Sequence, residues 1–283
     1  AAATAGIIAG NEDKELEVIS DVTTEEIEQM HAYLKSATFE IHCAKSEYIF
    51  DIGIRLYQNG HESYVRITDA HTNIVRIEKD HQILFEKEAA TVAVVKGSDR
   101  SFITVEGIID FADSVQLEDV EGILNRQIDY NMAISEEGLR NSYGANIGKV
   151  ILNHCGDAIQ SKAKAAAAAG SDARMNGCEM PVVINSGSGN QGMTASIPVI
   201  VYARETGIQN EQLLRALVVS NLVTIHLKTG VGRLSAYCGA VSAGCGCGAG
   251  IAYLEGGKYK EVAHTIVNSL AIVSGMVCDG AKA

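Results

Sequence analysis

Three thiols lie close together in "YCGAVSAGCGCGAG" (237–250), among glycine and alanine. Thiols at such density suggest a metal site, a redox pair or small side chains in a tight helix contact. On a helix, Cys238 and Cys245 would lie on one face roughly 10 Å apart, too far to bind one tetrahedral ion. Cys245 and Cys247 would point away from each other. The spacing disfavours zinc and predicts that Cys245 and Cys247 pack, whereas Cys238 and Cys278, at the ends of elements, stay open as candidate ligands.

A second candidate site is the glycine- and serine-rich segment "NSGSGNQG" (185–192), which leads into an apolar helical stretch. Free backbone N–H groups and the positive end of a helix dipole favour an anion. The segment has neither the Walker A nor the dinucleotide pattern, so a carboxylate or small oxyanion fits better than a nucleotide. A flexible turn capped by Asn and Ser is the alternative. The candidate residues are Asn185, Ser186, Gly187, Ser188, Gly189, Asn190 and Gln191.

Two further groups of polar residues are weaker candidates. Arg174, in "SDARMNG", is placed to form a salt bridge with a substrate carboxylate, although a structural or solvated ion pair is the commoner use of one arginine. His71, Thr72 and Asn73 lie at an expected turn between strands. A histidine can act as acid, base or ligand, but a lone histidine in a turn is more often a surface residue.

The elements that must position these residues change character along the chain. A Thr cap and early acidic residues predict a helix over 22–37. Runs rich in β-formers follow from "TFEIHC" (38–43) to "QILFEK" (82–87), with the hairpin dipeptide Asn59-Gly60 between two of them. From about residue 101 the spacing is helical. We therefore predict an α+β protein, in which a small antiparallel-sheet domain precedes a mostly helical catalytic domain. The expected divisions are a helix remnant (1–21), an α+β domain (22–100) and a helical cluster- and substrate-binding domain (101–283).

Composition narrows the class of partner. The chain has 283 residues, with 23 basic and 35 acidic side chains and a formal net charge of −12. This balance argues against nucleic acid and against an anionic membrane surface. No apolar run is long enough to span a bilayer. Seven cysteines without an export signal favour a reducing compartment, so we expect a cytoplasmic protein. The chain lacks an initiator Met, and we expect it to start in mid-protein.

Five motifs together carry a resemblance to a known family: "HTNIV", "SDARMNG", "NSGSGNQG", "YCGAVSAG" and "GMVCDGAKA". With them the chain resembles the L-cysteine desulfidases, which are related to the iron–sulfur L-serine dehydratases. The resemblance implies a [4Fe–4S] cluster held by three cysteines, two of which map onto Cys238 and Cys278. The family's third cysteine and its N-terminal motif, which carries the expected base, have no counterpart here. We therefore expect a fragment that is truncated at both ends.

The implied reaction is α,β-elimination of L-cysteine to pyruvate, ammonia and sulfide. Sulfide leaves poorly without an electrophile beside it, and an open iron would supply one. Substrate binding is assigned to residues 185–191 with Arg174, His71, Thr72 and Asn73. The alternatives are an L-serine dehydratase of the same class and a non-catalytic binding or sensor protein. The expected partner is a small amino acid, with no nucleic acid and no membrane, and a homodimer is left open.

Overall fold

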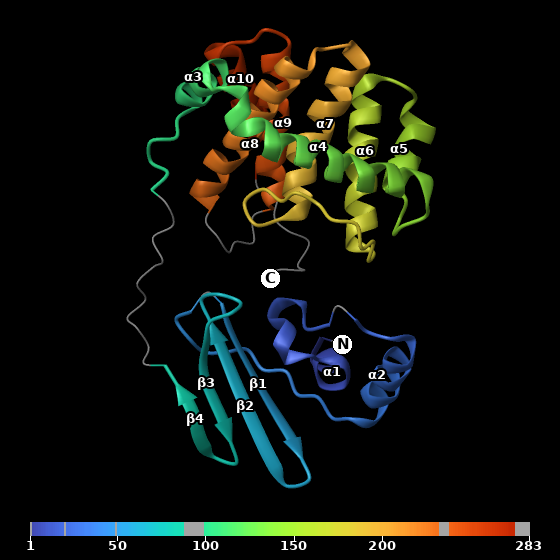
Figure 1. The fold of residues 1–283 in the computed structure, drawn as a ribbon, viewed down its shortest axis with the longest axis vertical. Helices are drawn as coiled ribbons and strands as arrows, with labels where there is room; N and C mark the ends of the chain where they lie inside the picture. The colour runs from blue at the N-terminus through green and yellow to red at the C-terminus, as the bar shows by residue number, and fades with distance from the viewer. Residues whose placement is uncertain (1, 20, 49, 88–98, 232–237, 275–283) are drawn as a thin grey trace. The chain divides into compact units, whose positions relative to one another are not determined.

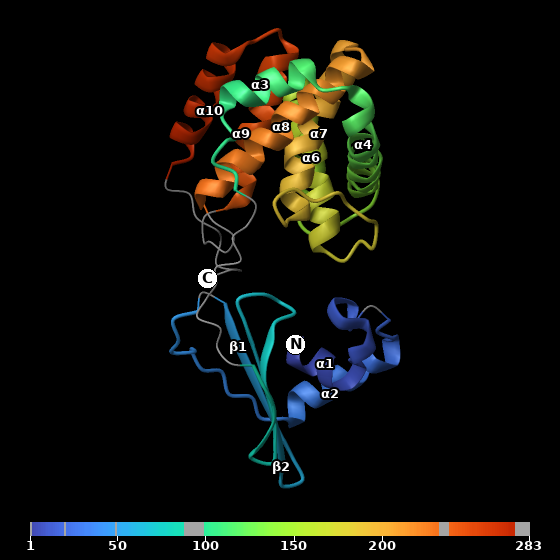
Figure 2. The ribbon, with the colours of Figure 1, turned by 60° about the vertical axis from the view of Figure 1, so that its left-hand side comes forward.

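The protein is described by a computed structural model that covers residues 2–19, 21–48, 50–87, 99–231 and 238–274. The chain divides into two compact units, residues 1–97 and 98–283 (Figure 1; Figure 2). The first contains a small antiparallel sheet and the second is built from helices. The α+β class predicted from the sequence is therefore confirmed. No helix in the described ranges combines the length and apolar character needed to cross a membrane.

The described residues of the first unit form two helices, a short 3-10 helix and one sheet. Thr23 caps the helix predicted over 22–37: its hydroxyl accepts from the Glu26 N–H, and the Glu26 carboxylate accepts from the Thr23 N–H. The sheet is an antiparallel meander in the order β1-β2-β3-β4. The elements are α1 (Ala2–Ala9), η1 (Glu12–Glu17), α2 (Thr24–Ser36), β1 (Asp51–Gln58), β2 (His61–Thr68), β3 (Ile74–Lys79) and β4 (Gln82–Glu86).

The turns of the sheet explain its register. Asn59 and Gly60 both have positive φ, 52° and 81°, and Gln58 pairs with His61 on either side of them. This is the two-residue hairpin that the Asn-Gly dipeptide predicts. The prediction of a strand over "TFEIHC" is wrong, because residues 38–43 form no regular element and Ile41 is 94% exposed. Its residues have strand propensity, but no strand of the described residues pairs with them.

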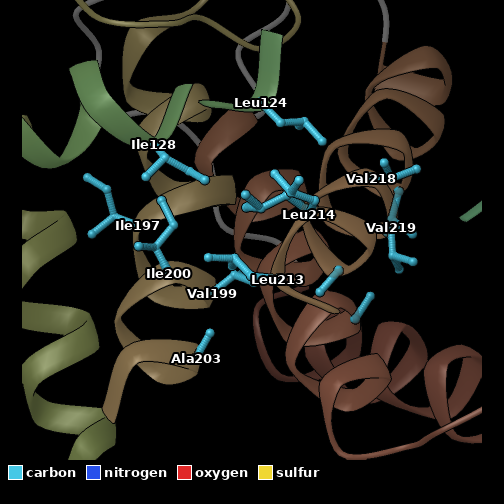
Figure 3. Close-up of a cluster of buried hydrophobic side chains, with 14 of the residues drawn as sticks. Leu124, Ile128, Ile197, Val199, Ile200, Ala203, Leu213, Leu214, Val218 and Val219 are labelled. Atoms are coloured by element: carbon cyan, nitrogen blue, oxygen red, sulfur yellow. The ribbon is translucent and has the colours of Figure 1, made fainter. Parts of the chain in front are cut away.

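The second unit is a helical bundle around an apolar core. Figure 3 shows part of this core, where Leu124 and Ile128, Ile197 and Ile200, and Leu213 and Leu214 come from three different helices. The helices are α3 (Val105–Ser114), α4 (Leu117–Arg140), α5 (Ile147–Cys155), α6 (Ile159–Met175), α7 (Gly189–Thr206), α8 (Asn210–Val231), α9 (Gly239–Leu254) and α10 (Tyr259–Ile272).

Small residues let α8 and α9 approach closely. A Cβ at Gly246 would collide with Thr224 Oγ1 and with the carbonyl oxygen of Ser220. Cys245 and Cys247 lie inside the unbroken helix α9, and Cys245 is 1% exposed. Burial raises the pKa of the Cys247 thiol to about 12. Both thiols are therefore held in the neutral form and pack, as the helical spacing predicts.

Candidate functional site

The segment 185–188 is a tight turn that delivers the chain into α7. The N–H of Asn185 donates to the Ser188 carbonyl and the N–H of Ser188 donates to the Asn185 carbonyl, both at 3.1 Å. Between them Ser186 and Gly187 have φ of 49° and 84°. Such a turn favours glycine at its second position, since a side chain there is strained. The Ser186 hydroxyl donates to Asn185 Oδ1 at 2.8 Å and keeps the turn closed.

The turn places the N-terminus of α7 beside a cation. Ser188 is the cap residue, and its carbonyl accepts the first intrahelical bond from Gly192 (3.1 Å). The N–H groups in the preceding positions have no acceptor within the helix and form its positive end. Arg174, at the end of α6, donates from Nη1 to Asn190 Oδ1 at 3.2 Å. A Cβ at Gly189 would collide with the Arg174 Nε, so the guanidinium lies directly across the helix end. Backbone donors and a guanidinium together can bind a carboxylate.

Amide side chains on α4 and α8 hold the turn, and sequence reasoning missed them. Asn185 Nδ2 donates to Asn221 Oδ1 on α8 at 2.8 Å. Asn221 and Gln127, on α4, exchange two hydrogen bonds of 2.8 and 3.0 Å. Asn131, one turn further along α4, is bonded to the backbone of Val183. The signal in the sequence is a row of polar residues at four-residue spacing along one face of the helix: Gln127, Asn131 and Ser135.

The helix that begins after Cys238 meets the same turn. Cys238 is the cap residue of α9, and its thiol is free and half-buried. The next residue, Gly239, lies against the side chain of Gln191, where a Cβ would collide with the Gln191 amide. Gln191 is 4% exposed, and its Oε1 is buried without a hydrogen-bond partner in the described structure. The first turn of α7 and the start of α9 therefore share one contact, which contains an unsatisfied acceptor.

Comparison with known proteins assigns the family. The model of the serine dehydratase alpha chain matches residues 13–283. The chain belongs to this family. It is 56% identical over 282 residues to a UPF0597 protein of Desulfitobacterium hafniense, covering 100% of the chain and 66% of that protein. It is 48% identical over 287 residues to a UPF0597 protein of Lachnoclostridium phytofermentans, covering 100% of the chain and 67% of that protein. The chain thus spans about two thirds of the length of these relatives. No solved structure matches.

The cofactor that family resemblance implies can be tested against the thiols of the second unit. Cluster ligands must be thiolates, and the N-terminal end of a helix favours negative charge. Cys238 fits, because its thiol is free and the residue lies at the N-cap position of α9, next to the contact of Gly239 with Gln191. Cys245 and Cys247 do not fit, since burial raises both thiol pKa values. Within the described ranges, no three His, Cys, Asp or Glu side chains converge. Cys278 lies outside the described residues, so the ligand pair stays a prediction.

The remaining candidates, His71, Thr72 and Asn73, belong to the first unit. They form the turn between β2 and β3, as predicted. Asn73 serves that turn, because its Nδ2 donates to the Thr68 carbonyl at 3.0 Å and its Oδ1 accepts from Lys87 Nζ at 2.8 Å. The His71 ring contacts Phe50, with ring centroids 4.8 Å apart. His71 and Thr72 are exposed, and their role in substrate binding stays a prediction.

Proposed function

We propose that this chain is the substrate- and cofactor-binding part of a serine dehydratase-like lyase. The enzyme eliminates sulfide from L-cysteine to give aminoacrylate, which water hydrolyses to pyruvate and ammonia. One observation carries the proposal. The turn at 185–188 aims the N-terminus of α7 and Arg174 at one place, and α9 begins there with Cys238. An anion-binding helix end beside a free thiol is the arrangement that an amino acid and a thiolate-held cofactor require together.

The residues around the turn have distinct roles in this proposal. The N–H groups of Gly189 and Asn190 donate to the substrate carboxylate, and Arg174 neutralises its charge. Gln191 faces the start of α9 and offers its unsatisfied Oε1 to a donor such as the substrate ammonium. Because these groups hold the amino acid by both of its charged ends, its Cα proton and its leaving group have a fixed orientation.

Cys238, together with Cys278, would hold the [4Fe–4S] cluster that the family resemblance implies. When bound, the cluster supplies an open iron that acts as a Lewis acid. The half-buried position of Cys238 limits the access of water to the ligand. The cysteines of the middle of α9 contribute packing and no ligand.

L-serine is the second candidate substrate, and the serine dehydratase family model favours it. Elimination of water from serine needs the same carboxylate site and the same electrophile, and it gives the same pyruvate and ammonia. The two substrates differ in the leaving group alone. The relative rates of pyruvate release from the two amino acids decide between them.

The test uses the full-length protein, reconstituted anaerobically with iron and sulfide. We expect pyruvate and sulfide from L-cysteine, with pyruvate from L-serine at a lower rate. Cys238→Ser should lose most of the bound iron. It should also lower the rate of pyruvate release by roughly 100-fold or more, because a ligand of the cofactor is removed. Cys247→Ala, in the same helix, is the matched control and should keep both iron and activity.

Two outcomes would count against the proposal. Unchanged iron content in Cys238→Ser would show that Cys238 is not a ligand. A reconstituted protein that binds amino acids but releases no pyruvate would be the non-catalytic sensor of the alternative hypothesis.

A further inference from the structure

The Asn131 side chain provides backbone hydrogen bonds for the segment that precedes the turn. Residues 178–184, between α6 and α7, form no regular element, so their backbone needs other hydrogen-bond partners. The Asn131 side chain is 0% exposed. Its Oδ1 accepts from the Val183 N–H at 2.8 Å, and its Nδ2 donates to the Val183 carbonyl at 3.2 Å. One side chain on α4 therefore fixes both backbone groups of a residue two positions before Asn185.

The same amide also reaches α7. Asn131 Nδ2 donates to Ser196 Oγ at 3.0 Å, and the Ser196 hydroxyl donates to the Gly192 carbonyl at 2.8 Å. The Val183 carbonyl and the backbone of Ile184 pack so closely on Gly192 that a Cβ there would collide with them. The segment before the turn and the first turn of the helix after it are thus held against each other.

Asn221 provides a second attachment from α8. Its Oδ1 accepts from Asn185 Nδ2 (2.8 Å) and from Gln127 Nε2 (3.0 Å), while its own Nδ2 donates to Gln127 Oε1 (2.8 Å). The Asn221 carbonyl accepts a further bond from Asn185 Nδ2 at 3.3 Å. Because the acceptor is shared, moving Asn185 would also disturb the bonds between Asn221 and Gln127, which join α8 to α4.

We propose that Asn131 and Asn221 are positioning residues, which hold the turn at 185–188 and the first turn of α7 (189–191) ready for the substrate before it binds. The inference rests on the proposed function, since the turn is assigned there to the carboxylate. A turn that is already ordered loses little conformational freedom when the ligand arrives, so its affinity is higher than that of a loose turn with the same donors. Neither amide touches the substrate in this proposal.

The test compares the same substitution at two buried positions of α4. Asn131→Ala removes the contacts with Val183 and Ser196. Ser135→Ala, one turn further along, is the matched control: Ser135 is also 0% exposed, and its hydroxyl donates to the Ala166 carbonyl of α6 at 2.7 Å. The probe is L-alanine, which has the carboxylate and ammonium but no leaving group. Its dissociation constant is measured by calorimetry, and backbone hydrogen exchange is followed over 183–191.

We expect Asn131→Ala to weaken L-alanine binding by about tenfold and to raise KM more than it lowers kcat. Exchange over 183–191 should become faster. Ser135→Ala should leave affinity and exchange unchanged even if its melting temperature falls as far. Equal loss of affinity in both variants, or wild-type affinity in Asn131→Ala, would overturn the proposal. If Asn131→Ala does not fold, Asn221→Ala is measured with the same readouts and the same criteria.

The outcome can be separated from that of the proposed function. A wild-type protein that neither binds L-alanine nor releases pyruvate refutes the proposed function. Hydrogen exchange still tests the amides in that case, because it needs no ligand. Unchanged exchange in Asn131→Ala then shows that the amides do not hold the turn.

Discussion

The two units of the chain are stabilised by different interactions. Among the described residues of 1–97, only Thr4 and Thr68 are buried, whereas the helical unit contains a continuous apolar core. The sheet relies on its backbone ladder and on ion pairs. Arg66 donates two hydrogen bonds to Asp51, at 2.9 and 2.7 Å, and these hold the pKa of the Asp51 carboxyl below its ordinary value. The helical unit uses burial instead, and this is where the candidate site lies. A site that needs fixed donors is built on the unit with the denser packing.

The largest expected effect tests this contrast with one substitution in each unit. Ile134, on α4, is 0% exposed, and Ile54, on β1, is 45% exposed. Ile134→Ala should lower the free energy of unfolding by about 3–4 kcal/mol, because it removes a packed side chain and leaves a cavity. Ile54→Ala should lower it by about 1 kcal/mol or less, since its side chain already contacts water. Denaturant titration followed by circular dichroism measures both losses.

Equal losses of unfolding free energy in the two variants would contradict this contrast between the units. They would mean that the β1 side chain is as deeply packed as the core of the bundle. A wild-type unfolding transition for Ile54→Ala, together with a strongly destabilised one for Ile134→Ala, would confirm that the apolar core stabilises the helical unit alone.

A smaller effect is expected from two glycines in α9. A Cβ at Gly246 would collide with Thr224 Oγ1 and the Ser220 carbonyl, whereas nothing lies within 4 Å of a Cβ at Gly244. Gly246→Ala should destabilise the helical unit by about 1–3 kcal/mol, because backbone of α8 must move. Gly244→Ala should stabilise it by up to about 1 kcal/mol, since alanine is the better helix former. Thermal melts compare the stability of the two variants. A loss of stability in both would show that the contact with α8 does not explain the need for glycine in this helix.

The role of these glycines could be predicted from the sequence only in part. The density of glycine in helical territory predicts close approach or a ligand, and the structure shows close approach at Gly246. The class, the hairpin at Asn59-Gly60 and the loop that enters α7 follow from local chemistry, which short windows of sequence contain. The strand predicted over "TFEIHC" was wrong, because strand propensity does not indicate whether a partner strand is present.

The amides behind the turn could not be predicted for a related reason. Asn131 lies 52 positions before its partner Val183, and no spacing rule connects them. Only the fold brings the two together. The ligand pair Cys238 and Cys278 remains a prediction from resemblance.

The smallest change in stability is expected from a substitution of Gln191. Its Oε1 is buried without a hydrogen-bond partner in the described structure. An unsatisfied buried acceptor costs about 1–3 kcal/mol, so Gln191→Met, which keeps the length and removes the amide, should leave the free energy of unfolding unchanged or raise it slightly. Gln127→Met is the matched control. Gln127 is 2% exposed, but both ends of its amide are bonded to Asn221, so its loss should cost about 2 kcal/mol.

The substitution at Gln191 should show its effect in the affinity for the ligand. Calorimetry with L-alanine should show weaker binding to Gln191→Met by about fivefold or more, because the acceptor offered to the ammonium is gone. A protein that retains an acceptor at a cost in stability, and loses affinity without it, uses that acceptor for something outside its own fold. If Gln191→Met instead loses as much stability as Gln127→Met and binds L-alanine normally, then Gln191 is a packing residue and does not hold the substrate ammonium.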